Sequence, residues 1–193
     1  MPWLIDNDDT GPESCTAVLR KFTELKCRLM PYIYSESIEA IKHGWPTSVR
    51  AMAIEFPEDR TAWLCDQQFM LGSSLLVAPV FDESGEVEFY LPDGAWTSLW
   101  DETKIVSGPR WVKEKHGFET LPLYVREGSI LALGKEGEKR TAYDWAKPDN
   151  HEMRCFGEAN GRRDFRLYNV EGDLVATLKA VEQQGGGLRV EGL

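Results

Sequence analysis

The sequence predicts an α/β segment followed by an all-β region, in which the incomplete end of an α/β unit joins an antiparallel β-sandwich. Three observations predict this fold class. A long stretch near the N-terminus has helical periodicity, a strand and a short helical stretch follow it, and the remainder consists of short apolar runs separated by glycine and proline. Strands at that spacing are typical of antiparallel sandwiches.

The first element is a helix over residues 15–43. Gly44 is a natural stop for it. Pro31 lies inside the pattern and removes one backbone donor, so it predicts a kink or a break into two helices. The apolar residues recur every three or four positions and therefore share one helical face: Val18, Phe22, Leu25, Leu29 and Ile33.

Next come a buried strand over 49–56 ("VRAMAIEF") and a short helix over 63–71 ("WLCDQQFML") that ends at Gly72. Helix, strand and helix make an α/β unit. One strand cannot form a parallel sheet, however, so the unit is incomplete.

From Ser74 onward the pattern changes to short strands. The candidates are "LLVAPVF", "EVEFYL", "AWTSLW", "PRWVKEK", "LPLYVR" and "SILALG". The stretch "LPDGAW" predicts a tight turn, because proline fixes φ and glycine supplies a positive φ. A polar stretch over 134–152 reads as a linker, and three further strands with turns between them follow it.

Composition excludes several classes of partner. The 193 residues include 22 Lys and Arg and 32 Asp and Glu, so the net charge is −10. An acidic chain repels phosphate backbones and anionic lipid, which argues against nucleic acid and membrane partners. No apolar run approaches the roughly 20 residues of a membrane helix. The N-terminal residues lack a signal-peptide pattern, so a cytoplasmic location is expected.

Cofactor and metal signatures are missing from the sequence. The four cysteines have no C-x-x-C spacing, which favours buried thiols in a reducing compartment and leaves a disulfide open. His43, His116 and His151 have no metal-ligand spacing. We expect His43 to complement the helix dipole and the other two to lie on the surface. No phosphate-binding, dinucleotide-binding or nucleophile-elbow motif is present, so no cofactor is predicted.

Carboxylates and tryptophans are the remaining candidates for chemistry. Acidic clusters occur at Asp6, Asp8 and Asp9 and within 55–59, but such clusters are more often caps or solvent-facing charge. Paired carboxylates can hydrolyse glycosides if they are held at the right separation, and spacing alone does not make either cluster catalytic. The β-rich part contains four tryptophans that could stack on sugars or fill a core, and a core role is favoured: Trp96, Trp100, Trp111 and Trp145.

Five segments in order carry a family resemblance: "LRKFTELKCRLMPYIYSE", "VRAMAIEFPED", "DQQFMLGSSLLVAPVF", "VEFYLPDGAWTSLW" and "HGFETLPLYVREGSILALG". Together they resemble glycoside hydrolase family 31, and most closely its α-xylosidase branch. The resemblance is strong up to about residue 145 and weaker beyond it. Five segments at compatible spacing are far more specific than any one of them.

The resemblance implies a (β/α)8 barrel followed by two β-sandwich domains. Residues 1–72 would be the C-terminal remnant of the barrel, 73–140 the proximal C-terminal β-sandwich domain and 141–193 the incomplete start of a distal β-rich domain. It also implies retaining hydrolysis of α-xylosides or α-glucosides through a covalent glycosyl-enzyme. The catalytic aspartates of the family lie upstream of these residues. No catalytic, substrate-binding or metal residue is therefore assigned here, and the chain alone should be inactive.

One departure from the family pattern concerns Ser73, where relatives usually carry aspartate. We expect Ser73 to form hydrogen bonds at a turn between barrel and sandwich rather than to act as a nucleophile, and Ser73→Asp to be tolerated or mildly stabilising. Two other functions stay open. The chain could be a non-catalytic carbohydrate-binding module, or a structural protein that self-associates through an open barrel edge.

Overall fold

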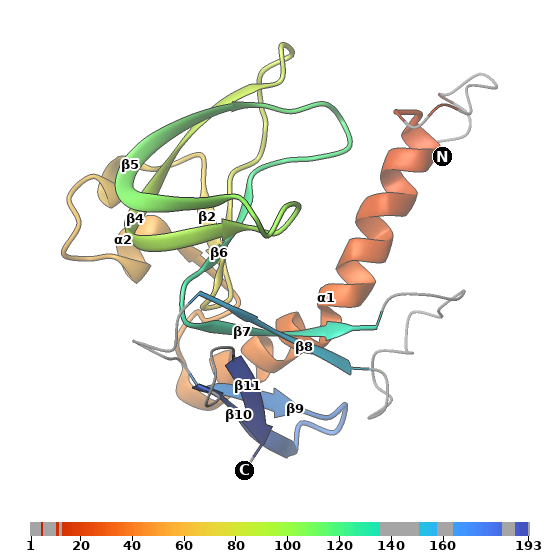
Figure 1. Ribbon diagram of the computed structural model, residues 1–193, viewed down its shortest axis with the longest axis vertical. Coiled ribbons are helices and arrows are strands. Elements are labelled where there is room, and N and C mark those ends of the chain that lie inside the picture. Colours follow the sequence, from red (N-terminus) through yellow and green to blue (C-terminus); the bar gives the residue numbers. More distant parts are fainter. Residues whose placement is uncertain are drawn as a thin grey trace.

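The computed structural model describes residues 5, 11, 13–135, 151–157, 164–182 and 188–192, with side chains up to residue 179. Most of its elements are strands, and helices are few (Figure 1). The elements in order are α1 (Cys15–His43), β1 (Val49–Ala51), α2 (Met52–Glu55), the 3-10 turn η2 (Ala62–Leu64), β2 (Phe69–Leu71), β3 (Leu75–Val77), β4 (Glu86–Ser98), β5 (Ile105–Lys115), β6 (Leu123–Arg126), β7 (Ser129–Gly134), β8 (His151–Phe156), β9 (Phe165–Tyr168), β10 (Leu174–Glu182) and β11 (Leu188–Gly192).

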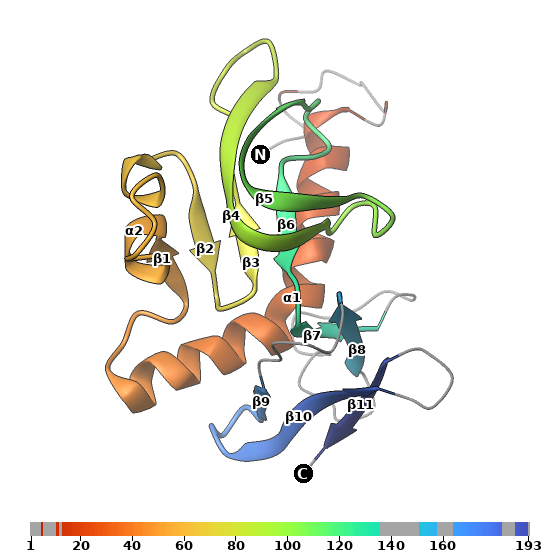
Figure 2. The same cartoon turned by 60° about the vertical axis from the view of Figure 1, so that its left-hand side comes forward.

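Helix α1 confirms the first predicted element. The Ser14 side chain caps its N-terminus by accepting a hydrogen bond of 3.2 Å from the Ala17 amide. Gly44 ends it in the left-handed conformation, and its N–H donates to the Ala40 carbonyl. Pro31 lies inside the helix, and Figure 2 shows that α1 changes direction partway along its length. The element is therefore one bent helix rather than two helices.

The predicted strand over 49–56 and the helix over 63–71 are wrong in part. Only the first three residues of 49–56 form a strand, and four residues of helix α2 follow them. Within 63–71, the single turn η2 gives way to coil and then to strand β2. Gly72 has a φ of 66°, which suits a helix end and a tight strand connection equally well. Because β2 pairs with both β1 and β3, Gly72 forms a connection between strands rather than the end of a helix.

Sheet A contains six antiparallel strands in the order β1-β2-β3-β6-β4-β5. Phe69–Leu71 pairs on one side with Val49–Ala51 and on the other with Leu75–Val77. The same sheet therefore extends across the boundary that the sequence predicts between residues 72 and 73. The hairpin of β4 and β5 forms its far edge (Figure 1).

The C-terminal strands form two smaller sheets. Strand β7 pairs with β8, and β9, β10 and β11 form a three-stranded sheet. The predicted boundary at residues 140 and 141 falls within 136–150, outside the described residues. Every strand pair in the described parts of the chain is antiparallel.

Two apolar clusters hold these layers together. One lies where α1 packs on β7 and β9, and Tyr32 and Leu131 are fully buried in it. The other lies on the face of sheet A that α2 covers, around Trp96 and Met70. None of the helices in the described residues is long and apolar enough to cross a membrane.

Candidate functional site

The histidines do not form a common site. His43 ends α1, and its Nε2 lies 3.1 Å from the Glu39 carboxylate one turn earlier, in keeping with its predicted place in the last helical turn. His151 lies in strand β8 and is half-buried. His116 is also half-buried, and its side chain is 12% exposed, so it lies only partly at the surface. Its ring nitrogens contact Glu114 at 2.8 Å and the Thr120 hydroxyl at 2.9 Å.

Glu114 is the centre of the polar cluster that contains His116. Its carboxylate also accepts hydrogen bonds from Lys104 and from the Tyr124 hydroxyl. Burial alone would raise the pKa of Glu114, but these hydrogen bonds lower it overall. The carboxylate therefore stays ionised near neutral pH and cannot serve as a general acid. The cluster connects β5 to β6, which is a structural role.

Ser73 lies in the turn between β2 and β3 and forms hydrogen bonds there, as predicted. Its hydroxyl donates to the Glu36 carboxylate of α1 at 2.6 Å. The partner is thus a carboxylate rather than a backbone amide. Burial raises the pKa of Glu36, although the bonds from Ser73 lower it. The neighbouring Tyr32 hydroxyl donates to the Leu71 carbonyl and accepts from the Ser74 amide. This network fastens the turn to α1.

The carboxylates within 55–59 also have structural partners. The Glu55 side chain is 8% exposed and forms ion pairs of 3.2 Å with Arg50 and 2.8 Å with Arg126. Asp59 accepts hydrogen bonds from the Tyr90 hydroxyl and from a backbone amide. Asp6, Asp8 and Asp9 lie outside the described residues.

The tryptophans divide between core and surface. Trp96 is fully buried, and its indole N–H donates to the Pro92 carbonyl at 2.8 Å, which confirms a core role. Trp100 is half-buried and donates to the Leu121 carbonyl. Trp145 lies outside the described residues. Trp111 is 48% exposed, so the core role predicted for it is wrong.

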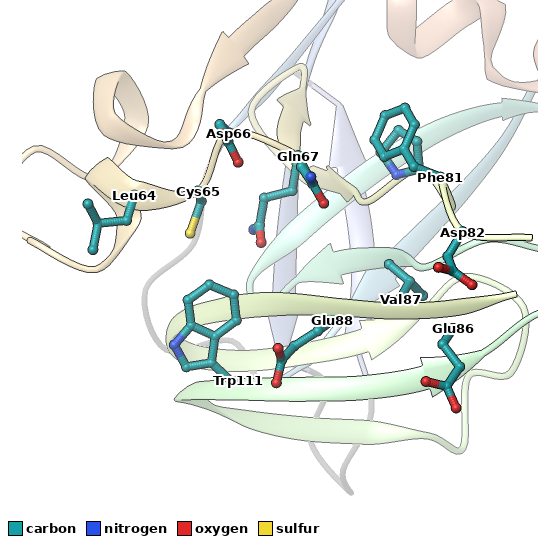
Figure 3. Close-up of a pocket in the computed structure, with 12 residues that line it drawn as sticks. Leu64, Cys65, Asp66, Gln67, Phe81, Asp82, Glu86, Val87, Glu88 and Trp111 are labelled. Carbon is teal, nitrogen blue, oxygen red and sulfur yellow. The ribbon is translucent and has the colours of Figure 1, made fainter. Parts of the chain in front are cut away.

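Trp111 lines the pocket that is the candidate functional site (Figure 3). The pocket has a volume of about 420 Å³ and lies between the outer face of the β4–β5 hairpin and two loops. Figure 3 shows Trp111 and Glu88 along the hairpin, with the loop around Cys65 across from them. The lining residues are Leu64, Cys65, Asp66, Gln67, Gln68, Pro79, Phe81, Asp82, Glu86, Val87, Glu88 and Trp111.

Strand register fixes the position of the indole. Trp111 lies directly opposite Tyr90, and their ring centroids are 5.5 Å apart. The Tyr90 backbone donates to and accepts from the Gln68 side-chain amide at 2.7 and 2.8 Å, so Gln68 replaces a neighbouring strand there. The Tyr90 hydroxyl donates to Asp59 at 2.7 Å. Hydrogen bonds thus fix both the backbone and the side chain of Tyr90, against which Trp111 packs.

The titratable groups of the pocket favour binding over acid–base catalysis. Hydrogen bonds from Ser84 lower the pKa of the exposed Asp82, and Lys113 lowers that of Glu86. A catalytic acid needs the opposite shift. Desolvation and the charges of Asp59 and Asp66 raise the pKa of the Cys65 thiol to about 11, which makes it a poor nucleophile at neutral pH.

Neither a metal-binding cluster nor a disulfide is found among the described residues. Within the described ranges, no group of three His, Cys, Asp or Glu side chains is placed to hold a metal ion. No disulfide joins the four cysteines, all of which are described. Trp111 could have been found from the sequence through the alternation of strand β5, which puts it on the face opposite Val112. The loop that completes the pocket could not have been found from the sequence, because the pattern of residues 63–71 predicts a helix.

The described residues therefore define a class of protein: an antiparallel β domain with a long helix and a pocket on its outer sheet face. Residues 45–131 match the family profile described as Glycosyl hydrolase family 31 C-terminal domain. The α-xylosidase of Emericella nidulans is 40% identical over an alignment of 146 positions that covers 72% of this chain and 18% of that protein. The α-xylosidase XylQ of Lactiplantibacillus pentosus is 33% identical over 96% of this chain and 23% of its own length.

Solved structures give the same assignment. The cycloalternan-forming enzyme from Listeria monocytogenes superposes with a TM-score of 0.81 at 27% identity, over 95% of this chain and 17% of that one. A family 31 dextranase from Flavobacterium johnsoniae gives a TM-score of 0.76 at 26% identity, over 93% and 22%. The chain belongs to glycoside hydrolase family 31. It spans about a fifth of the length of the relatives it matches.

Proposed function

We propose that this chain is the C-terminal part of a retaining α-glycoside hydrolase of α-xylosidase type. The match of residues 45–131 to the family's C-terminal domain carries the proposal. The choice of α-xylosides over α-glucosides is supported by the two α-xylosidases described above, although α-glucosidases of Saccharolobus solfataricus and Bacillus thermoamyloliquefaciens also match at 32% and 28% identity.

The proposal includes a division of the chain. We assign α1 to the end of the catalytic barrel and sheet A, which begins at Val49, to the proximal C-terminal domain. We propose a boundary near Gly44 in place of the one expected between residues 72 and 73, and the pairing of β1 and β2 within sheet A supports this choice. We assign the strands from β8 onward to a distal β-rich domain.

Exposed apolar side chains support an origin within a larger assembly. Ile41 on α1 is 78% exposed, and Leu19, Trp45 and Val49 are also largely exposed. Such residues expose apolar surface that other segments of a longer protein would cover, or that would lead isolated chains to self-associate. The cytoplasmic location expected from the sequence stays a prediction.

In the proposed reaction, one carboxylate attacks the anomeric carbon and a second acts first as acid and then as base. The carboxylates described above do not supply this pair. Glu55 is engaged with two guanidinium groups, and Glu114 is held ionised by its donors. Both catalytic carboxylates would therefore come from barrel segments other than α1.

The test is an activity assay on the purified chain. With p-nitrophenyl α-xyloside and α-glucoside, we expect no nitrophenol release above the blank, while full-length XylQ serves as the positive control on the α-xyloside. Turnover that a substitution within this chain abolishes would overturn the proposal, because it would place the catalytic residues here.

A further inference from the structure

We propose that the Trp111 pocket is a binding site for a neutral oligosaccharide. The inference does not rest on the activity proposed above. The pocket volume of about 420 Å³ lies within the range of about 300 to 1,000 Å³ that small-molecule sites occupy.

The aromatic wall is the first observation. Trp111 leaves about half of its surface exposed, and Phe81 at the other end of the pocket is 71% exposed. Sugar rings have apolar faces of C–H groups that stack on an indole. An aromatic side chain binds a ligand more tightly when it is already ordered, because no free energy is then spent on fixing its conformation. The contact with Tyr90, which Gln68 and Asp59 hold in place, orders Trp111 in advance.

The polar groups are the second observation. Asp66, Asp82 and Glu88 line the same pocket as Trp111 and are exposed. An ionised carboxylate accepts hydrogen bonds through two oxygens, so it can pair with hydroxyl groups on adjacent sugar carbons. These groups add acceptors along the pocket from Trp111 to Phe81, which suits a ligand that consists of hydroxyl donors.

Charge selects among possible ligands. The carboxylates in the pocket repel anions such as phosphorylated sugars and uronic acids. Lys113 forms an ion pair of 2.8 Å with Glu86 and so offsets only part of this charge. Within the described residues, the carboxylates are not arranged to hold a metal ion. A neutral, hydroxyl-rich ligand with an apolar face meets both conditions.

The experiment measures sugar binding to the full 193-residue chain by isothermal titration calorimetry at pH 7. The probes are maltotriose and, as an acidic ligand of matched length, trigalacturonate. We expect maltotriose to bind and trigalacturonate not to bind. Trp111→Ala should weaken maltotriose binding at least about tenfold, which corresponds to about 1.4 kcal/mol.

Trp63→Ala is the matched control. Trp63 is also an exposed tryptophan, at 62%, and does not line the pocket. It should leave maltotriose affinity unchanged. Glu88→Gln keeps the shape of the pocket and removes one charge, so it should weaken maltotriose binding by about threefold. Circular dichroism establishes that each variant is folded.

Three results would overturn the inference. The first is the absence of maltotriose binding by the unsubstituted chain at about 10 mM sugar. The second is an equal loss of affinity in Trp63→Ala and Trp111→Ala. The third is trigalacturonate binding as tight as that of maltotriose, because it would contradict the charge argument.

Discussion

Replacement of Ser73 by aspartate tests the network beneath the β2–β3 turn. The Ser73 hydroxyl donates to the Glu36 carboxylate at 2.6 Å, and Glu36 is only 7% exposed. An aspartate at position 73 cannot donate when ionised, and it brings a second negative charge to the same place. The structure therefore reverses the expectation from sequence, which treats Ser73→Asp as tolerated or mildly stabilising.

The size of the effect follows from two contributions. Two charges 4 Å apart repel by about 4 kcal/mol at an effective dielectric constant of 20. Loss of a hydrogen bond to a charged group costs about 1.5 to 3 kcal/mol. The aspartate side chain can rotate toward solvent, and one of the two carboxylates can take up a proton. Both responses make the loss of stability smaller than the sum of the two contributions. We expect Ser73→Asp to lower the free energy of unfolding by about 3 kcal/mol at pH 8.

The pH dependence gives a second readout. Burial already raises the pKa of Glu36, and an adjacent aspartate raises it further. A raised pKa in the folded state stabilises the fold at low pH, and that stability is lost as pH rises through the folded pKa. The deficit of Ser73→Asp should therefore shrink between pH 8 and pH 5, as measured by urea unfolding followed by circular dichroism.

Matched variants separate charge from hydrogen bonding. Ser73→Asn has the shape of aspartate and can still donate to Glu36, so it should stay close to the unsubstituted chain. Combining Ser73→Asp with Glu36→Gln should restore most of the lost stability. A Ser73→Asp chain at least as stable as the unsubstituted one at pH 8 would refute the reasoning.

Three other substitutions test separate parts of the fold. Glu55→Ala removes the carboxylate between two guanidinium groups and should lower the free energy of unfolding by about 3 to 5 kcal/mol, measured in urea. Gly72→Ala should be more damaging than Gly44→Ala in thermal unfolding. A Cβ at Gly72 would lie 2.1 Å from the Tyr32 hydroxyl oxygen, whereas at Gly44 only the backbone cost of about 1 to 2 kcal/mol applies. Glu114→Gln should flatten the loss of stability on acidification, because the lowered pKa of Glu114 contributes stability that disappears as pH falls through its folded pKa.

Each of these has an outcome that contradicts it. A loss below about 1 kcal/mol in Glu55→Ala would mean that the ion pairs are screened as surface pairs are. Equal melting temperatures for Gly72→Ala and Gly44→Ala would show that the turn is not pressed against α1. An unchanged acid profile in Glu114→Gln would remove Glu114 from the groups that govern acid stability.

Helix α1 was predictable because the residues that determine it lie close together in the sequence. An apolar stripe, a proline that bends it and a glycine that ends it lie within 30 consecutive positions, and the structure has the helix over Cys15–His43. Most strands after Ser74 were predictable for the same reason, since alternation and turn residues mark them in the sequence. Neither prediction needed a contact between distant segments. The tight turn predicted at "LPDGAW" is wrong, because strand β4 runs through it from Glu86 to Ser98 with only a register shift between Leu91 and Gly94.

The structure of residues 63–71 could not be predicted from the local sequence alone. Its residues permit a helix, and Gly72 fits either a helix end or a strand turn. Long-range pairing of Phe69–Leu71 with two other strands selects the strand. The pocket depended on the same pairing, because the loop before β2 forms one of its walls. The exposure of Trp111 likewise depends on which other segments pack on each face of sheet A. The alternation of residues along one strand does not show which face is covered.

We propose that this chain supplies the C-terminal part of an α-glycoside hydrolase whose catalytic residues lie elsewhere. The direct measurement is the activity of a chimaera in which the aligned 72% of this chain replaces the matching segment of the Emericella nidulans α-xylosidase. We predict that the chimaera hydrolyses p-nitrophenyl α-xyloside while this chain alone does not. A chimaera that is folded, as shown by circular dichroism, and yet inactive on both the α-xyloside and the α-glucoside would contradict the claim.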